Sequence, residues 1–165
     1  MSNLEQCKIS LQIHSSLAKT LQFVVVDCQY SMATYSTSKR KRRPHGDCTS
    51  IEMTLHLKQT FEATILTQLH PRSQIYIYVQ ILQADGSNYC TCVNAAILAV
   101  IVVGIPMWDY MCTSSASFIE NTPLADLSYV EESAGGSHLF LALLPKSEQI
   151  TLLEMNLRLH EDHLE

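Results

Sequence analysis

Residues 75–82 have the sequence IYIYVQIL, and this apolar stretch decides the fold. Its β-branched and aromatic residues predict a strand, and apolar character on both faces is typical of a strand in a covered sheet. The turn-forming residues 85–88, DGSN, follow, and then comes an almost wholly apolar run from 89 to 102. We predict that this run is a helix capped by Ser87 or Asn88, and that it is buried on every side.

A similar pair of elements comes earlier in the chain. Residues 23–26 (FVVV) and 30–37 (YSMATYST) predict extended structure. A helix is then predicted to begin at Thr49, because Thr49 and Glu52 match a capping box, and to end near Leu69, because apolar residues recur every four positions up to there.

Further extended segments are expected after the second helix, at 110–119, 124–127, 138–144 and 149–155. The order is thus strand, helix, strand, helix and then several strands. It favours an α+β or α/β fold with a mixed sheet.

The composition limits the class of protein. The chain has 165 residues, of which 47% are hydrophobic and 16% charged, which excludes a disordered chain and is typical of one globular domain. The longest apolar stretch, 95–105, is shorter than the roughly 20 residues that cross a membrane. The N-terminus lacks the pattern of a secretory signal, so we expect no membrane contact.

The six cysteines contain no CxxC pair, which argues against a zinc ribbon. Cys90 and Cys92 point in different directions on a helix and are expected to be small buried thiols rather than metal ligands. We therefore expect neither a metal nor a cofactor.

A basic run is the strongest interaction signal in a chain whose net charge is -5. Its cations could contact the phosphates of a nucleic acid, or serve as a nuclear import signal. A solvated loop is the plain alternative. The run consists of Lys39, Arg40, Lys41, Arg42 and Arg43.

Many stretches between about residues 24 and 165 resemble the RNase PH family, and more closely the RNase PH-like core ring subunits of the eukaryotic RNA exosome. The stretches occur in the same order as in the family. They are 28–31 (CQYS), 39–47 (KRKRRPHGD), 59–63 (QTFEA), 66–74 (LTQLHPRSQ), 81–86 (ILQADG), 104–107 (GIPM), 125–127 (ADL) and 158–165 (RLHEDHLE).

This resemblance implies an α+β fold, the two-layer βαβ domain called ribosomal protein S5 domain 2-like. Residues 24–165 would form an RNase PH-like core that lacks the family's N-terminal strands and C-terminal helix, after an unmatched segment 1–23. It also implies RNA, other RNase PH-like ring subunits and cap subunits as partners. The implied setting is rRNA maturation and mRNA turnover in the nucleus, nucleolus and cytoplasm.

The resemblance also implies where catalysis would take place. Active relatives hold inorganic phosphate at the start of the second helix, on a Ser or Thr followed by Arg. Here Asn88 and the neutral Tyr89 take those places, so the loop of Gly86, Ser87, Asn88 and Tyr89 would be a remnant of the phosphate site.

Other catalytic positions differ as well. Cys48 and Thr49 replace two basic residues of active archaeal relatives. Asp126 matches the catalytic aspartate and Glu132 a second acid, and we expect both to be vestigial.

We therefore expect a chain that is not an enzyme, and that binds RNA and neighbouring subunits as a scaffold of the exosome ring. One alternative is a phosphate-dependent 3′-to-5′ exoribonuclease. Another is a truncated paralogue without function.

Overall fold

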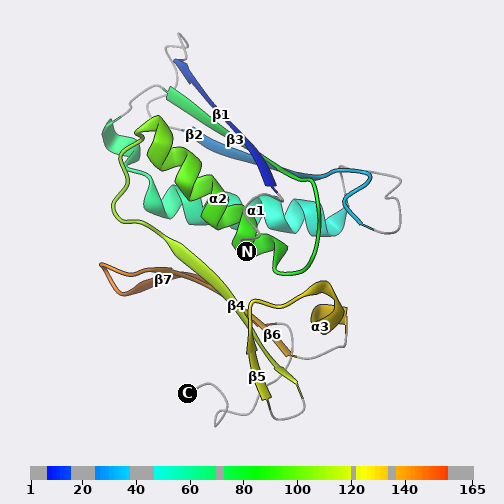
Figure 1. Ribbon diagram of the computed structural model, residues 1–165. Helices are drawn as coiled ribbons and strands as arrows, with labels where there is room; N and C mark the ends of the chain where they lie inside the picture. Colours follow the sequence, from blue (N-terminus) through cyan, green and yellow to red (C-terminus); the bar gives the residue numbers. More distant parts are fainter. Residues whose placement is uncertain are drawn as a thin grey trace.

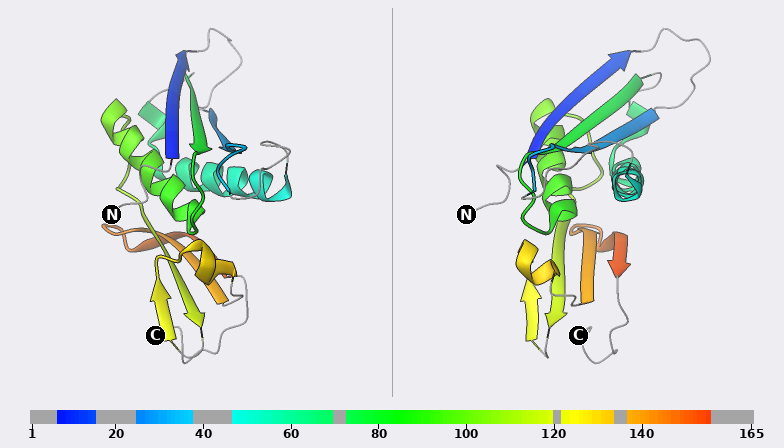
Figure 2. Two further views of the ribbon diagram at one scale, coloured as in Figure 1. Left: turned by 45° about the vertical axis from the view of Figure 1, so that its right-hand side comes forward. Right: turned by 90° about the vertical axis from the view of Figure 1, so that its right-hand side faces the viewer.

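The computed structural model describes residues 7–15, 25–37, 47–69, 73–119, 122–133 and 137–155. Within them, two sheets enclose a pair of helices, α1 (Cys48–Thr64) and α2 (Asn88–Val103) (Figure 1). The two views of Figure 2 show the same three layers from other sides. The predicted α+β class is confirmed.

The first sheet has the order β1-β3-β2 and is mixed, as expected. Its central strand β3 (Ser73–Ile81) pairs antiparallel with β1 (Cys7–Ser15) and parallel with β2 (Val25–Met32). The apolar stretch that decides the fold is thus the middle of the sheet. The strand β1 falls in the segment 1–23, which contains none of the stretches that resemble the family.

Only one face of β3 is fully covered. Its isoleucines and Val79 point to the helices and are at most 1% exposed. On the other face Tyr76 and Tyr78 are half-buried and stack with ring centroids 6.2 Å apart. The prediction that both faces are covered is therefore wrong, and paired aromatic rings provide the apolar character of the second face.

Helix α1 contributes the buried side chains of Leu57 and Phe61, as its four-residue repeat predicted. It begins after Asp47 rather than at Thr49, and it ends at Thr64, with Ile65 as its C-cap, rather than near Leu69. The early end has a physical cause. The chain turns to meet the segment after α2, where the backbone N–H of Trp108 donates to the Thr64 carbonyl oxygen at 2.9 Å.

Helix α2 is buried along its first turns and exposed at its end. Cys92 and Val93 have no exposed surface, whereas Val102 is 86% exposed. The prediction of burial on every side is wrong for the last turns, because the strands that cover this helix from the second sheet contact it near its beginning. The predicted stop is confirmed: Gly104 has a φ of +80° and ends the helix in the left-handed conformation that favours glycine.

The second sheet is antiparallel and has the order β5-β4-β6-β7. Its strands lie within a few residues of the predicted segments, and a short helix α3 (Tyr129–Ser133) joins β5 to β6. The strands are β4 (Cys112–Ile119), β5 (Thr122–Ala125), β6 (Ser137–Leu144) and β7 (Gln149–Met155). Among the helices of the described ranges, none has the length and apolar character that crossing a membrane requires.

Candidate active site

The start of α2 is locked against the loop between β5 and α3. Gly86 has a φ of +95°, and a Cβ placed there would overlap the carbonyl oxygen of Leu127. Ser87 follows with a φ of +47°, and its hydroxyl donates to the Leu127 carbonyl oxygen at 3.2 Å. The same hydroxyl shares a hydrogen bond with the hydroxyl of Ser115 on β4. Three segments of the chain therefore meet at this point.

Asp126 lies in the loop that meets the start of α2, and its side chain is exposed. It has a φ of +58°, a left-handed conformation that costs a non-glycine residue about 1 kcal/mol or more. Its backbone N–H donates to the Ser115 carbonyl oxygen at 3.1 Å. The neighbouring contacts therefore impose the conformation and fix the place of the carboxylate.

A groove of about 570 Å³ runs between α2 and β4, and Asp126 is part of its lining. Its wall is polar near the start of α2 and apolar toward the end of that helix, where Ile97 and Ile101 lie. The remaining polar lining residues are Thr91, Asn94, Thr113, Ser114 and Ser115.

Asn94 fastens the two walls of the groove together. Its Oδ1 accepts the backbone N–H of Thr113 at 3.0 Å, and its Nδ2 donates to the Thr113 carbonyl oxygen at 3.0 Å. The Thr113 hydroxyl also donates to the Cys90 carbonyl oxygen at 2.9 Å. The side chain of Asn94 thus pairs with β4 as another strand would.

Sequence reasoning missed Asn94 and Ser115. Asn94 did carry a signal, since a single amide inside an almost wholly apolar helix must find a partner when it is buried. Ser115 carried none, because it is one of several serines in a polar stretch.

Tyr89 does not line the groove. It is 2% exposed, and its ring lies edge-on to Phe140 on β6 and to His56 on α1, with centroids 6.3 and 6.1 Å away. Burial raises the pKa of its phenol, and a contact with Thr60 lowers it in part. The side chain belongs to the packing between α1, α2 and the second sheet.

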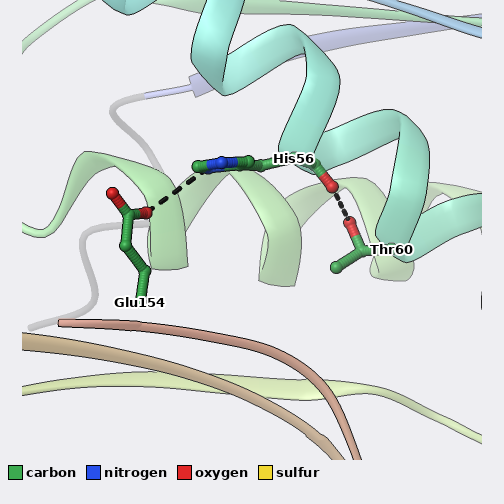
Figure 3. A network of polar contacts seen from close by, with 3 residues as sticks. All are labelled: His56, Thr60 and Glu154. Atoms are coloured by element: carbon green, nitrogen blue, oxygen red, sulfur yellow. Dashed lines mark hydrogen bonds and ion pairs between the residues drawn. The ribbon is translucent and has the colours of Figure 1, made fainter.

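His56 connects α1 to the second sheet beside Tyr89. Its Nδ1 lies 3.4 Å from Oε2 of Glu154 on β7, and Thr60 donates its hydroxyl hydrogen to the His56 carbonyl oxygen at 2.7 Å. Figure 3 shows the imidazole directed across to the carboxylate of Glu154.

The acidic pair does not gather in the groove. Asp126 is in its lining, whereas Glu132 is half-buried on α3 and is not among the lining residues. The backbone N–H of Glu132 donates to the Ser128 carbonyl oxygen at 2.9 Å. On α3 it is the carboxylate of Glu131 that forms hydrogen bonds. It accepts the backbone N–H and the hydroxyl of Ser128, each at 2.8 Å, and these bonds lower the pKa of Glu131.

The other predicted site residues are placed as follows. Asn88 is the half-buried first residue of α2, and Cys48 is the exposed first residue of α1. The basic run 39–43 lies outside the described residues. In the part of the chain that the structure describes, no three histidine, cysteine or acidic residues form a group that could hold a metal.

Comparison with known proteins gives a consistent result along the chain. Residues 6–106 match the model of the 3′ exoribonuclease family, domain 1, and residues 109–165 match that of domain 2 of the same family. Exosome complex component RRP41 from Homo sapiens is 66% identical over 155 residues, 93% of this chain and 63% of the relative. Exosome complex component Rrp41 from Methanopyrus kandleri is 38% identical over 132 residues, 80% of this chain and 55% of the relative.

The chain therefore spans about 63% of the length of the human relative. Among solved structures, the exosome of Archaeoglobus fulgidus with RNA bound to the active site has a chain that matches with a TM-score of 0.74. The match covers 96% of this chain and 70% of that one, at 14% identity, so it concerns the fold.

These findings correct one prediction. We expected a catalytically degenerate chain that is not an enzyme. That prediction is wrong, because both family models describe a 3′ exoribonuclease. It rested mainly on the neutrality of Tyr89, and also on the uncharged Cys48 and Thr49. The Tyr89 side chain is packed in the core instead of facing the groove.

Proposed function

Because the chain belongs to the 3′ exoribonuclease family, the family of RNase PH, we propose that it degrades RNA as a subunit of an exosome-type assembly. The groove between α2 and β4 holds the 3′ end of the RNA, and Asp126 supplies the general acid for the reaction. The partners in this proposal are RNA, other RNase PH-like ring subunits and cap subunits. The setting is rRNA maturation and mRNA turnover in the nucleus, nucleolus and cytoplasm.

The observation that carries this proposal is the position of Asp126. An exposed carboxylate is held in a strained backbone conformation, in the lining of a groove and beside the start of a long helix. Strained non-glycine residues cluster at active sites, where the surrounding structure fixes a reacting group. The name of the human relative, an exosome component, supports the assembly.

The proposed reaction is phosphorolysis. An oxygen of inorganic phosphate attacks the phosphorus of the last phosphodiester, and the bond to the 3′ oxygen of the preceding nucleotide breaks. That 3′ oxygen leaves with a proton, which in this proposal Asp126 donates as a general acid. The products are a nucleoside diphosphate and an RNA shortened by one nucleotide.

The attack also needs positive charge, because a phosphate anion approaches an anionic backbone. Among the described residues that line the groove there is no lysine or arginine. In this proposal the cations come from the basic run 39–43 or from a neighbouring subunit. The proposal therefore places the activity in the assembled ring.

The test is a phosphorolysis assay on a ring assembled with this chain. We expect RNA with a labelled 5′ end to shorten only when phosphate is added, with release of nucleoside diphosphates. Asp126→Asn should lower the rate at least about 100-fold, because a neutral amide cannot donate the proton. Asp27→Asn, an exposed carboxylate on β2, is the matched control and should leave the rate unchanged.

Two results would contradict the proposal. One is a ring with Asp126→Asn that shortens RNA as fast as the unchanged ring. The other is a chain that fails to assemble with RNase PH-like subunits although it is folded by circular dichroism.

A further inference from the structure

Two thiols that are 85 positions apart in the sequence meet between the first sheet and α2. The Sγ atoms of Cys7 and Cys92 are 3.7 Å apart and share a hydrogen bond. Cys7 is the first residue of the edge strand β1 and is half-buried, whereas Cys92 lies in the second turn of α2 with no exposed surface. The Cys7 thiol can therefore be reached from the solvent, and the buried Cys92 thiol lies directly behind it.

We propose that Cys7 and Cys92 are a modification site, at which a small disulfide such as glutathione disulfide forms an intramolecular disulfide bond that thiol reductants reverse. This disulfide involves neither the groove nor Asp126, so it is independent of the proposed function.

The geometry requires little movement. A disulfide needs its sulfur atoms at about 2.0 Å, and rotation about the Cα–Cβ bonds can close the remaining gap when the backbones are already side by side. Here β1 is hydrogen-bonded along its whole length to β3, with Cys7 opposite Ile81, and α2 packs on this sheet. Both cysteines therefore lie on packed elements, and the 3.7 Å between their Sγ atoms is the gap that side-chain rotation has to close.

The two thiols also differ in pKa, and a two-step exchange needs such a difference. The hydrogen bond from Cys92 lowers the pKa of the Cys7 thiol, although burial opposes this. The same hydrogen bond and burial raise the pKa of Cys92. Since the thiolate is the nucleophile, Cys7 is the first to attack.

The exchange balances in two steps. The Cys7 thiolate attacks one sulfur of glutathione disulfide, forms a mixed disulfide and releases the first glutathione thiolate. Cys92 then loses its proton and attacks the Cys7 sulfur, and the second glutathione leaves. The protein has lost two electrons and two protons, and one glutathione disulfide has become two glutathione thiols.

The other described cysteines are less suited to this exchange. Burial raises the pKa of Cys28 and of Cys90 to about 12, so these thiols are poor nucleophiles. Cys48 and Cys112 are exposed. They can exchange with glutathione disulfide to form mixed disulfides, but neither has a second thiol behind it, and they serve as controls.

The bond would pin an edge strand to the helix whose start forms the candidate active site. Closing a loop of this length restricts the unfolded chain, and the melting temperature should rise by about 5–10 °C. Reduction should return it to the starting value.

The experiment treats the purified full chain with glutathione disulfide and measures its intact mass under denaturing conditions. We expect a product that has lost two hydrogen atoms, beside glutathione adducts on the exposed Cys48 and Cys112, and a Cys7–Cys92 cross-linked peptide after proteolysis. The double variant Cys48→Ser, Cys112→Ser should form the product lighter by two hydrogen atoms without these adducts. Cys7→Ser should not, and its melting temperature should not respond to the oxidant. This variant changes a half-buried edge residue, so circular dichroism is expected to show an intact fold.

Three outcomes would overturn the proposal. The first is a Cys7–glutathione adduct that persists without loss of the second glutathione. The second is a disulfide that maps to Cys90 or to another pair. The third is an equal yield of the lighter product from Cys7→Ser.

Discussion

Gly86 is the residue at which the start of α2 comes closest to the loop of Asp126. Its φ of +95° is a conformation that L side chains rarely adopt, and an added methyl would meet the backbone of residues 127–129. These neighbours are main chain, so they cannot move aside as a flexible side chain would. A glycine is therefore needed here for two separate reasons.

We expect Gly86→Ala to lower the free energy of unfolding by at least about 2 kcal/mol, because strain and overlap add. Gly104→Ala is the matched control. Gly104 also has a positive φ, of +80°, but nothing lies within 4 Å of its added Cβ, so its cost should be about 1 kcal/mol. Chemical denaturation of both variants measures the difference. Equal losses would show that the contact with Leu127 does not constrain the loop.

The sequence could predict some residues of the site but not the direction of every side chain. Asp126 could be named, because its short motif ADL resembles the family, and the structure places it in the groove. The prediction that Tyr89 faces a phosphate site rested on its matching position in the family alone. Whether a side chain at the start of a helix faces a groove or the core depends on what packs behind the helix, and here His56 and Phe140 do so.

At the scale of elements, α2 has two different halves. Its first half lies between both sheets and is attached to β4 by Asn94, while its last turns carry exposed apolar side chains such as Leu98 and Val102. The hydrogen bonds of Asn94 with Thr113 set the spacing of the groove walls.

Asn94→Ala should lower the free energy of unfolding by about 1–3 kcal/mol, because it leaves the N–H and C=O of Thr113 without these partners. Val102→Ala, at an exposed position of the same helix, should change it by less than about 0.5 kcal/mol. Thermal and denaturant unfolding of the two variants provide the comparison. A loss in Asn94→Ala no greater than that in Val102→Ala would mean that other contacts hold α2 to β4.

The elements were predicted well where one pattern dominated. The existence of the strand near 75–82, the glycine stop of α2 and the strand 149–155 all match the structure. The strand β1 was missed although apolar residues stand at every second position from Cys7 to Ile13, which is the pattern of a half-buried strand. Its partner β3 comes about 60 residues later, and this pairing could not be predicted from the sequence. The end of α1 was missed because a tertiary hydrogen bond, rather than a local signal, turns the chain at Ile65.

At the scale of the whole molecule, the packing of α1 against the second sheet includes an ion pair. His56 lies 3.4 Å from Glu154, and this pair carries opposite charges only when the imidazole is protonated. Both side chains are partly exposed, with 19% and 37% of their surface accessible, so solvent screens the attraction.

A double-mutant cycle with His56→Ala and Glu154→Ala should give a coupling energy of about 0.5–1 kcal/mol at low ionic strength and less at high salt, because salt screens the attraction between partly exposed charges. The pair Lys58–Glu62 within α1, 4.0 Å apart, is the control, and its coupling should be about 0.3–0.5 kcal/mol, the usual value for a pair four residues apart on a helix. A coupling between His56 and Glu154 that does not fall with added salt would contradict the ion pair.

The fold as a whole followed from the sequence mainly through the resemblance to a family. The residues alone gave the order of the elements and a mixed sheet. They could not show that the strands divide into two sheets, because strand partners are set by packing across the molecule. That division is seen in Figure 1, where β4 leads away from the helices into the second sheet.

Within the described residues, the chain passes from the first sheet to the second only once, through the segment 104–111 that follows α2. Each sheet is therefore built from consecutive residues. Chimeras can take residues 1–104 from this chain and the remainder from a homologue. They need to match only the side chains through which the two parts contact each other, such as Asn94 on α2 with Thr113 on β4. Recombination at this point can exchange one half of the molecule without disturbing the hydrogen-bond pairing inside the other.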